Sequence, residues 1–462
     1  MAAQRPNILF VICDELRAQA VPPTREDPTV TPHLDRFAGE ALALTDMVAT
    51  SPVCSPYRAL LLSGRYPHAN GVLENCNSDQ EGTANYLKPD EVCFTDVLAA
   101  HGYQCGYIGK WHLDHPDPAS YAYTEGRRRD GRVWDSFTPP GPGRHGCAFW
   151  YAYGVYDNHF YPHYWSGDGG IKERIDVHQW SVRHETDVAI DYLRNTSGQR
   201  DPEAPFCLVV SHNPPHMPFN RVPAEYRRAY STLGPERLLN RGNVSLQRQG
   251  ALAAEAVEGY FAAVTGIDEQ FGRLLACLEE QGLAADTIVV FSADHGEMMG
   301  SHGRIGKGVW YEESLRIPFL LRWPGRVEPR RDDLLMGGAD LHPTLLGLTG
   351  LAEAIPPQVQ GTDYAPLLRG VAMPRPTSAF YLLLGNAHPE LGRRGIRTHG
   401  HTFVRIREPG TAEQLILHDN RADPYQLRNA ATANPALVRE LTAELDGWLE
   451  RTGDPWHRTT VP

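Results

Sequence analysis

The strongest constraint on the fold is a repeated alternation of short apolar runs with amphipathic stretches. The apolar runs read as strands and lie at 7–13, 103–109, 206–212, 287–293 and 317–323. Strands that are apolar on both faces fit a parallel sheet covered by helices. The stretches with helical periodicity lie at 33–44, 57–63, 94–101, 179–195, 251–282 and 340–350. This order predicts an α/β sandwich around a central, mainly parallel sheet.

Two regions depart from this alternation. Residues 114–170 are rich in aromatic residues, Pro, Gly and Arg and show no sustained period, so we interpret them as a long insertion of the kind that shapes binding sites. Strand-like runs then appear at 378–384, 401–406 and 413–419, before a helix near 434–451. We therefore expect a catalytic domain at 1–370 and a small α+β subdomain at 371–462.

Composition bears on partners and location. The net charge is −12, with Lys and Arg dispersed, which disfavours nucleic acid or an anionic membrane as a partner. The first apolar run is too short to span a bilayer and lacks a small-residue cleavage site, so nothing suggests export. The eight cysteines form no CxxC pair, and several lie in strand-like runs. Reduced, buried thiols in a cytoplasmic protein explain them better than a disulfide framework.

Polar, reactive residues follow four of the expected strands. The carboxyl ends of parallel strands meet at one edge of a sheet, where functional residues collect. We therefore expect one site to contain the residues that follow these strands, which are Asp14, Glu15, Lys110, His112, His212, His216, Asp294 and His295.

The segment SPVCSPYRALLLSGR, residues 51–65, places a thiol at the start of an expected helix. Pro56 suits the first turn, so Cys54 would lie near a helix N-terminus, which lowers a thiol pKa and favours anions. Arg58 could project back toward the same point. A structural cysteine is an equal alternative for an isolated CxPxR pattern.

Several segments in order resemble the type I sulfatases of the alkaline-phosphatase superfamily. They are RPNILFVICDELR, TPHLDRFAGEAL, CSPYRALLLSGRYPHANGV, GYIGKWHL, PPHMPF and SADHGEMMGSHGRIGKGVWYEESLRIPFLLRWPG. The resemblance runs from residue 6 to about 326 and continues more weakly in LHDNRADPYQLRNAA. It implies an alkaline-phosphatase-like sandwich and sulfatase activity.

In the family that this chain resembles, a separate formylglycine-generating enzyme oxidises the cysteine, so Cys54 would become formylglycine. A hydrated aldehyde carries two hydroxyls, one of which can attack sulfur and expel the alcohol. The second hydroxyl then lets the covalent sulfate ester collapse to aldehyde and free sulfate. A serine could perform only the first step.

The resemblance also implies a metal site formed by Asp14, Glu15, Asp294, His295 and the oxygen at position 54. Carboxylate oxygens favour Ca²⁺, or Mg²⁺ with more water, and the imidazole leaves room for Mn²⁺. The family usually has Asp-Asp or Asp-Gln at 14–15, so Glu15 departs from that pattern by one methylene group.

The remaining expected roles concern the substrate. By resemblance, Lys110 and Lys307 bind sulfate oxygens. His112 contacts the formylglycine hydroxyl, and Arg58 holds the formylglycine in place. His216 matches the family histidine that protonates the leaving alcohol. His212 and Asn75 are further candidates for substrate binding, and we expect His302 to be structural or to support residues of the site from behind.

The resemblance leaves the substrate open among alkyl, aryl and carbohydrate sulfates. Aromatic residues of the insertion, such as Trp150 and Tyr153, suit stacking on a sugar or a quaternary ammonium. One alternative is a phosphonate monoester or phosphodiester hydrolase on the same scaffold. Another is a non-catalytic metal-binding protein whose Cys54 is never converted. Family members occur as monomers, dimers and tetramers, so a homo-oligomer is compatible with the sequence.

Overall fold

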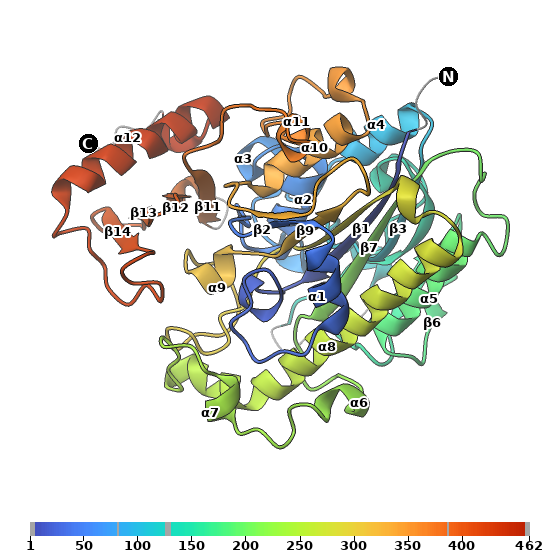
Figure 1. Cartoon of the computed structure of the whole chain (residues 1–462), viewed down its shortest axis with the longest axis horizontal. Helices are drawn as coiled ribbons and strands as arrows, with labels where there is room; N and C mark the ends of the chain where they lie inside the picture. The colour runs from blue at the N-terminus through green and yellow to red at the C-terminus, as the bar shows by residue number, and fades with distance from the viewer. Residues whose placement is uncertain (1–4, 81–82, 125–130, 386–387, 458–462) are drawn as a thin grey trace.

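A ten-stranded sheet runs through the middle of the molecule (Figure 1). The structure is a computed structural model that describes residues 5–80, 83–124, 131–385 and 388–457. The strand order is β10-β2-β9-β8-β1-β7-β3-β4-β5-β6. The bounds are β1 (Asn7–Asp14), β2 (Leu42–Leu44), β3 (Gln104–Lys110), β4 (Cys147–Tyr153), β5 (His163–Ser166), β6 (Ile175–Asp176), β7 (Phe206–Pro215), β8 (Thr287–Ala293), β9 (Phe319–Arg322) and β10 (Arg330–Asp332).

The centre of this sheet is parallel, as the sequence predicts. Strands β8, β1, β7, β3 and β4 pair in parallel, so their carboxyl ends meet at one edge. Strand β9, which corresponds to the expected strand at 317–323, instead runs antiparallel to both β8 and β2. The sheet is therefore mixed toward its edges and parallel where the reactive residues emerge.

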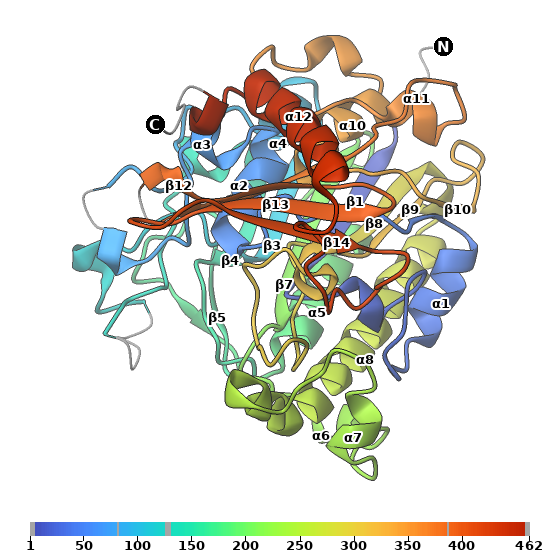
Figure 2. The ribbon, with the colours of Figure 1, turned by 90° about the vertical axis from the view of Figure 1, so that its left-hand side faces the viewer.

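Helices cover both faces of the sheet, which completes the expected sandwich (Figures 1 and 2). One layer contains α1 (Pro32–Gly39), α5 (Ser181–Arg194) and α8 (Ala251–Glu280), and the other contains α2 (Cys54–Ser63), α4 (Phe94–Ala100) and α10 (Leu341–Leu348). Shorter helices are α3 (Pro67–Asn70), α6 (Ala224–Arg227), α7 (Pro235–Leu238), α9 (Glu312–Leu315) and α11 (Ala365–Leu368). The helix expected at 33–44 ends at Gly39, because Leu42–Leu44 forms strand β2.

The insertion at 114–170 is more regular than its composition suggests. Its strands β4 and β5 extend the main sheet, with β4 parallel to β3 and β5 antiparallel to β4. Aromatic side chains favour a pleated, half-buried surface, which explains the strand at CAFWYAY. Residues 125–130 of the insertion lie outside the described residues.

A separate antiparallel sheet follows near the C-terminus, where the sequence predicts an α+β subdomain. Its strands are β11 (Ala379–Gly385), β12 (His388–Arg397), β13 (His401–Arg407) and β14 (Gln414–Asp419), with α12 (Pro435–Thr452) lying across it (Figure 2). Alternate residues serve opposite faces: the ring of Phe380 stacks on Trp448 of α12, whereas Tyr381 packs in a cluster with Val48 and Trp310. The expected domain boundary at residue 370 lies between α11 and β11 and stays a prediction.

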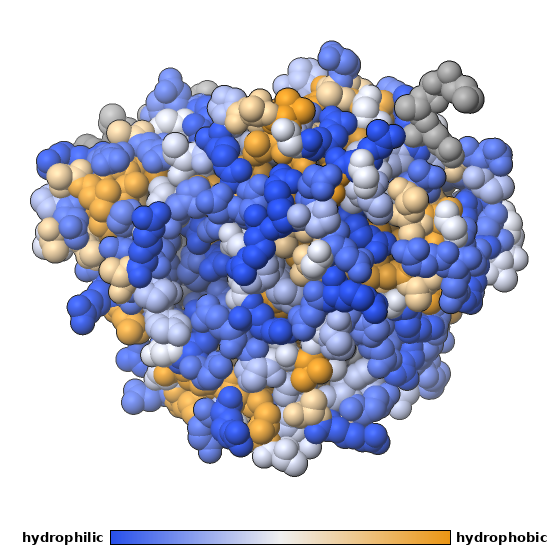
Figure 3. All heavy atoms as spheres, viewed as in Figure 1, coloured by the Kyte–Doolittle hydropathy of each residue, from blue (hydrophilic) through white to orange (hydrophobic). Residues whose placement is uncertain are grey.

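The surface shows no single dominant apolar area on the face drawn in Figure 3, where hydrophilic residues surround separate apolar areas. Within the described parts of the chain, no helix combines the length and apolarity that a membrane crossing requires. The expected homo-oligomer stays a prediction.

Candidate active site

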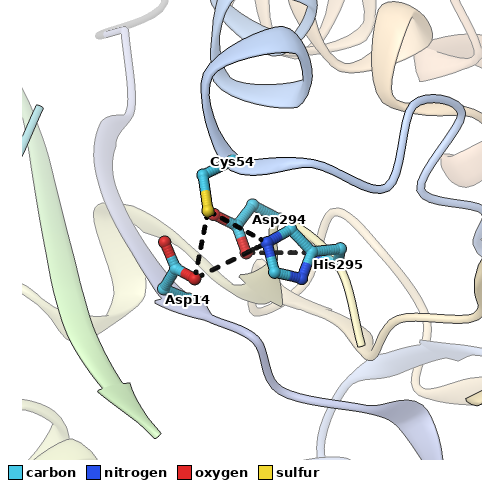
Figure 4. A group of neighbouring side chains, drawn as sticks. All are labelled: Asp14, Cys54, Asp294 and His295. Atoms are coloured by element: carbon cyan, nitrogen blue, oxygen red, sulfur yellow. Dashed lines mark hydrogen bonds and ion pairs between the residues drawn. The ribbon is translucent and has the colours of Figure 1, made fainter. Parts of the chain in front are cut away.

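Cys54 lies at the centre of a group of buried polar side chains from three elements (Figure 4). It is the first residue of α2, and Val53 before it is extended. Its Sγ lies 3.2 Å from His295 Nε2 and 3.6 Å from Asp14 Oδ1. One ligand atom from each of Asp14, Cys54, Asp294 and His295 lies within 4.8 Å of the others. The structure thus brings four of the five expected metal residues together.

Arg58 joins the two carboxylates of this group. Its Nε lies 3.1 Å from Asp294 Oδ2, and its Nη2 lies 3.2 Å from Asp14 Oδ2. Its Nη1 donates to the carbonyl of Lys110 at 2.9 Å and to the Ser211 hydroxyl at 2.7 Å. The planar guanidinium has donors in a fixed fork, so a single side chain one helical turn after Cys54 sets the spacing of both carboxylates.

Lys110 is fully buried at the end of β3, where its Nζ lies 2.6 Å from Asp14 Oδ2 and 3.1 Å from Asn213 Oδ1. Gly109 before it has φ +96°, and a Cβ there would lie 2.2 Å from the carbonyl oxygen of Ser211. Only glycine permits this close approach of β3 to β7. The close approach brings Lys110 to Asp14 across the intervening strand.

Lys307, Glu15 and His216 form a second group beside the first. Glu15 has φ +67° and does not join the group around Cys54. Its carboxylate lies 3.2 Å from Lys307 Nζ and 3.4 Å from His216 Nε2. Ligand atoms of Asp14, Glu15 and His216 also lie within 4.8 Å of one another, so Asp14 belongs to both groups. The longer side chain of Glu15 thus pairs with a lysine and a histidine.

Two residues that the sequence suggests for substrate binding are engaged elsewhere. The Nδ1 of His212 lies 2.6 Å from Glu185 Oε2, on α5. Successive residues of β7 point to opposite faces, so Ser211 and Asn213 face Arg58 and Lys110, whereas His212 faces α5. Asn75 Oδ1 accepts the backbone N–H of Ser55 at 3.0 Å and so satisfies a donor in the first turn of α2.

His112 and His302 complete the set of predicted histidines. His112 is buried with φ +56°, and its Nε2 lies 3.2 Å from the carbonyl oxygen of Cys76. Its Nδ1 is buried and has no hydrogen-bond partner among the described residues. His302 stacks on Tyr311 with ring centroids 3.7 Å apart, which agrees with the structural role expected for it.

Burial and neighbouring charges set the ionisation of the carboxylates. Burial acts to raise the pKa of Asp14, but Lys110 and the nearby histidines outweigh it and hold that pKa well below its usual range. Burial and the Asp14 charge raise the pKa of Asp294. Of the two carboxyl groups, Asp14 therefore ionises more readily. A stable negative charge suits a group that faces a cation.

Burial shifts the pKa values of the thiol and the imidazoles toward their neutral forms, so the pKa of Cys54 is raised and not lowered as its place at a helix N-terminus suggests. Burial, reinforced by the charge of Asp14, raises the pKa of Cys54 to about 12, so an unmodified thiol at this position stays protonated. Burial, with the charge of Lys307, holds the pKa of His216 well below its usual range. Burial and the charge of Lys110 do the same to His112.

The structure adds two residues that the sequence did not single out. Asn213 accepts a hydrogen bond from Lys110 and donates to the carbonyl of Tyr156 at 2.7 Å. Ser211 lies between Arg58 and the carbonyl oxygen of Lys110, to which its hydroxyl donates at 2.8 Å. Both residues lie just before the PPHMPF segment, at alternate positions of β7. Alternate residues of a strand share a face, so this two-residue periodicity is the sequence signal that could have found them.

The fold and the site together define a hydrolase of the alkaline-phosphatase-like class. The sulfatase family profile matches residues 6–351, and the profile described as N-sulphoglucosamine sulphohydrolase, C-terminal, matches residues 300–452. The chain therefore belongs to the sulfatase family, and it is an enzyme that hydrolyses sulfate esters.

Sulfatases of two bacteria align with nearly the whole of this chain. An endo-4-O-sulfatase of Bacteroides thetaiotaomicron is 38% identical, over 99% of this chain and 94% of its own length. An ulvan-active sulfatase of Formosa agariphila is 33% identical, over 97% of this chain and 82% of its own. A solved structure from work on the metabolism of multiple glycosaminoglycans by Bacteroides thetaiotaomicron has a TM-score of 0.92 and 38% identity, and covers 98% of each chain.

Proposed function

We propose that the protein removes O-sulfate groups from saccharides by using a formylglycine made from Cys54. The observation that carries the proposal is the position of Cys54 Sγ, 3.2 Å from His295 Nε2 and 3.6 Å from Asp14 Oδ1 at the start of α2. In this structure the Sγ stands where the oxygen of the aldehyde would be. The names of the two relatives and the glycosaminoglycan context of the similar structure support a saccharide substrate.

The residues around position 54 fit a divalent cation. Two carboxylates and one imidazole supply oxygen and nitrogen donors, and the conversion of Cys54 would replace a soft sulfur by a hard oxygen. We propose Asp14, Asp294 and His295 as protein ligands, with Ca²⁺ as the ion because carboxylates dominate. Bound there, the ion would supply electrostatic stabilisation of negative charge on the reacting oxygens. Glu15 pairs with Lys307 and His216, so we propose that it orients them.

Position 54 would act as the nucleophile. One hydroxyl of the hydrated aldehyde loses its proton to solvent and attacks sulfur, the bond from sulfur to the alcohol oxygen breaks with its electron pair going to oxygen, and that leaving oxygen takes up a proton from His216. The other hydroxyl then loses its proton, the carbonyl forms again, and sulfate leaves with the electron pair of the breaking C–O bond. Asn75 supports this step by holding the N–H of Ser55 and thereby the start of α2.

The surrounding side chains would bind sulfate and assist departure of the alcohol. Lys110 lies beside Asp14 and Lys307 lies beside Glu15, so both cations can stabilise charge that develops on the transferred sulfuryl oxygens. His216 can give a proton to the leaving oxygen, because its Nε2 lies beside the site, 3.4 Å from Glu15 Oε2, while its Nδ1 lies 2.9 Å from the carbonyl oxygen of Met217 and 3.6 Å from Asp157 Oδ1. An anionic substrate beside His216 favours its protonated form.

The mass of the peptide that carries Cys54 tests the proposal directly. Co-expression with a formylglycine-generating enzyme should replace CH₂SH by CHO in that peptide, and the converted protein should release sulfate from sulfated saccharides. Cys54→Ala should be inactive. Cys54→Ser should accumulate a sulfated enzyme without turnover, because it lacks the second hydroxyl. A Cys54→Ala variant with full activity would refute the mechanism.

A comparison of rates tests the rival on the same scaffold. We expect faster hydrolysis of sulfate esters than of aryl phosphonate monoesters, because both lysines expected for sulfate are present.

The eight cysteines are free and buried, which supports the proposed location in a reducing, cytoplasmic compartment.

A further inference from the structure

A second group of metal-ligand side chains lies between the start of α4 and the loop that leads into β4. It consists of Cys93, Asp96 and His145, each of which offers one ligand atom within 4.8 Å of the others. None of these residues belongs to the group around Cys54. We propose that they bind a zinc ion, with a water molecule as the fourth ligand.

The chemistry of the three donors favours zinc over the hard cation expected at the active site. A sulfur, an imidazole nitrogen and a carboxylate oxygen are the protein ligands that Zn²⁺ uses, and three such ligands leave one position for water. Calcium and magnesium prefer oxygen alone. Cys93 is fully buried and His145 is 1% exposed, whereas the Asp96 side chain is 33% exposed and gives an ion a route from solvent.

The backbone brings these donors together by a close approach that only glycine permits. Gly146 has φ +75°, and a Cβ there would lie 2.8 Å from the carbonyl oxygen of Thr95 and 3.1 Å from Asp96 Cα. The loop before β4 can therefore touch the first turn of α4. His145 itself has φ +45°, and its Nδ1 lies 3.2 Å from Asp96 Oδ2.

The present hydrogen bonds leave room for coordination. Asp96 Oδ2 accepts the backbone N–H of Cys93 at 2.9 Å and faces His145 Nδ1, so Oδ1 is the oxygen that can turn to an ion. The Nε2 of His145 is buried and has no hydrogen-bond partner among the described residues. The imidazole can therefore offer Nε2 after a ring flip without losing a hydrogen bond of that nitrogen, whereas Nδ1 would exchange its contact with Asp96 Oδ2 for the ion.

The site would fasten the insertion to the catalytic core. His145 stacks on Trp111, with ring centroids 6.0 Å apart, and Trp111 lies between Lys110 and His112 in the chain. Zinc at Cys93, Asp96 and His145 would fix the loop that packs against this tryptophan. Binding would release the thiol proton of Cys93, since the thiolate is the metal ligand.

Cobalt binding to the full-length protein tests the proposal. The protein carries Cys54→Ala, which removes the only other thiol in a metal-ligand group of the described residues, and excess Ca²⁺ is present. One equivalent of Co²⁺ should produce a thiolate-to-cobalt charge-transfer band, and zinc should abolish it by competition. Absence of the band at one equivalent would overturn the proposal.

Substitutions identify the ligands. Cys93→Ser should abolish the band, while serine keeps a good residue at the start of α4. Asp96→Asn and His145→Asn should each weaken Co²⁺ binding by at least about tenfold, and asparagine tolerates the left-handed backbone at position 145. Cys277→Ser, which removes a buried thiol from α8, is the matched control and should retain the band.

The melting temperature provides a second readout, which does not depend on the thiolate-to-cobalt absorption band. Zinc should raise the melting temperature of the Cys277→Ser control and leave that of Cys93→Ser unchanged. An equal zinc shift in both variants, or a band that persists in Cys93→Ser, would overturn the proposal. Unchanged Co²⁺ affinity in both Asp96→Asn and His145→Asn would overturn it as well, even if Cys93→Ser failed to fold.

Discussion

Lys110 Nζ lies 2.6 Å from Asp14 Oδ2, although the two residues end strands that are separated by β7. Both side chains are fully buried, so the contact is an ion pair shielded from water. An unpaired charge in such a place is costly, and each partner therefore depends on the other. This pair links the proposed metal ligands to the proposed sulfate-binding cations.

Replacement of Lys110 should affect the chemical step most. Lys110→Met removes a cation aimed at developing charge, and we expect kcat to fall by about 10² to 10³ with a smaller change in KM. Lys110→Arg should not restore the rate, because the buried position fits a compact ammonium between Asp14 and Asn213. Steady-state kinetics on a sulfated saccharide measure both effects.

The matched control for Lys110 is Lys172→Met, since Lys172 is exposed. This variant should retain the rate of the unsubstituted enzyme. An unchanged kcat in Lys110→Met would contradict the assigned role.

Asn75 should matter for the position of Cys54. Asn75→Ala leaves the backbone N–H of Ser55 without its partner, and we expect a loss of about 1 kcal/mol in unfolding free energy together with a lower kcat. Asn75→Asp keeps an acceptor oxygen and should recover most of the stability. Chemical denaturation and kinetics on the three proteins separate this role from substrate contact, which would change KM alone.

Removal of the proposed cation should inactivate the enzyme. Treatment with a chelator, followed by desalting, should abolish sulfate release, and Ca²⁺ should restore it more fully than Mg²⁺ or Mn²⁺ because carboxylates dominate the donor set. Asp294→Asn should need a higher Ca²⁺ concentration for half-maximal activity. Full activity of the chelated, desalted protein would show that no exchangeable cation is required.

Asp340 makes stability depend on pH in a defined direction. Burial raises the pKa of this carboxyl to about 6, against hydrogen bonds from the N–H groups of Thr362 and Gly337. Because the folded pKa exceeds the unfolded one, the folded state holds the proton more tightly. The resulting stabilisation is present below the unfolded pKa and is lost as pH rises through about 6.

Asp340→Asn remains neutral at every pH and therefore isolates this contribution. The unfolding free energy of the variant minus that of the unsubstituted protein should increase by up to about 3 kcal/mol between about pH 4 and about pH 7. Denaturant unfolding of both proteins in the same buffers measures the difference. A difference that is constant or decreases with pH would contradict the expected shift.

The central strands were predictable because burial on both faces leaves a continuous apolar run in the sequence. The runs at 7–13 and 287–293 correspond to neighbouring parallel strands, β1 and β8. The edges of the sheet were less predictable. Leu42–Leu44 continues the apolar pattern of α1, and its pairing with β9 and β10 identifies it as a strand. Tertiary pairing of this kind has no local signal.

The group around Cys54 was predictable for a similar reason. Asp14 ends β1 and Asp294 directly follows the neighbouring parallel strand β8, so topology alone places them together. The directions of individual side chains were not predictable. His212 lies at the end of the expected strand but inside β7, which extends to Pro215, and its side chain faces α5. The position of a strand end decides such assignments, and sequence patterns fix strand ends poorly.

The pairing of β4 with β3 limits how the insertion can diverge among related enzymes. The N–H groups of Trp111 and His112 donate to the carbonyls of Tyr153 and Gly154, so the backbone that carries Lys110 and His112 is held in part by the insertion. Any deletion that removes β4 would loosen that backbone. New substrate preferences in this lineage should therefore arise from exchanges at the loop tips of the insertion, with its strands inherited unchanged.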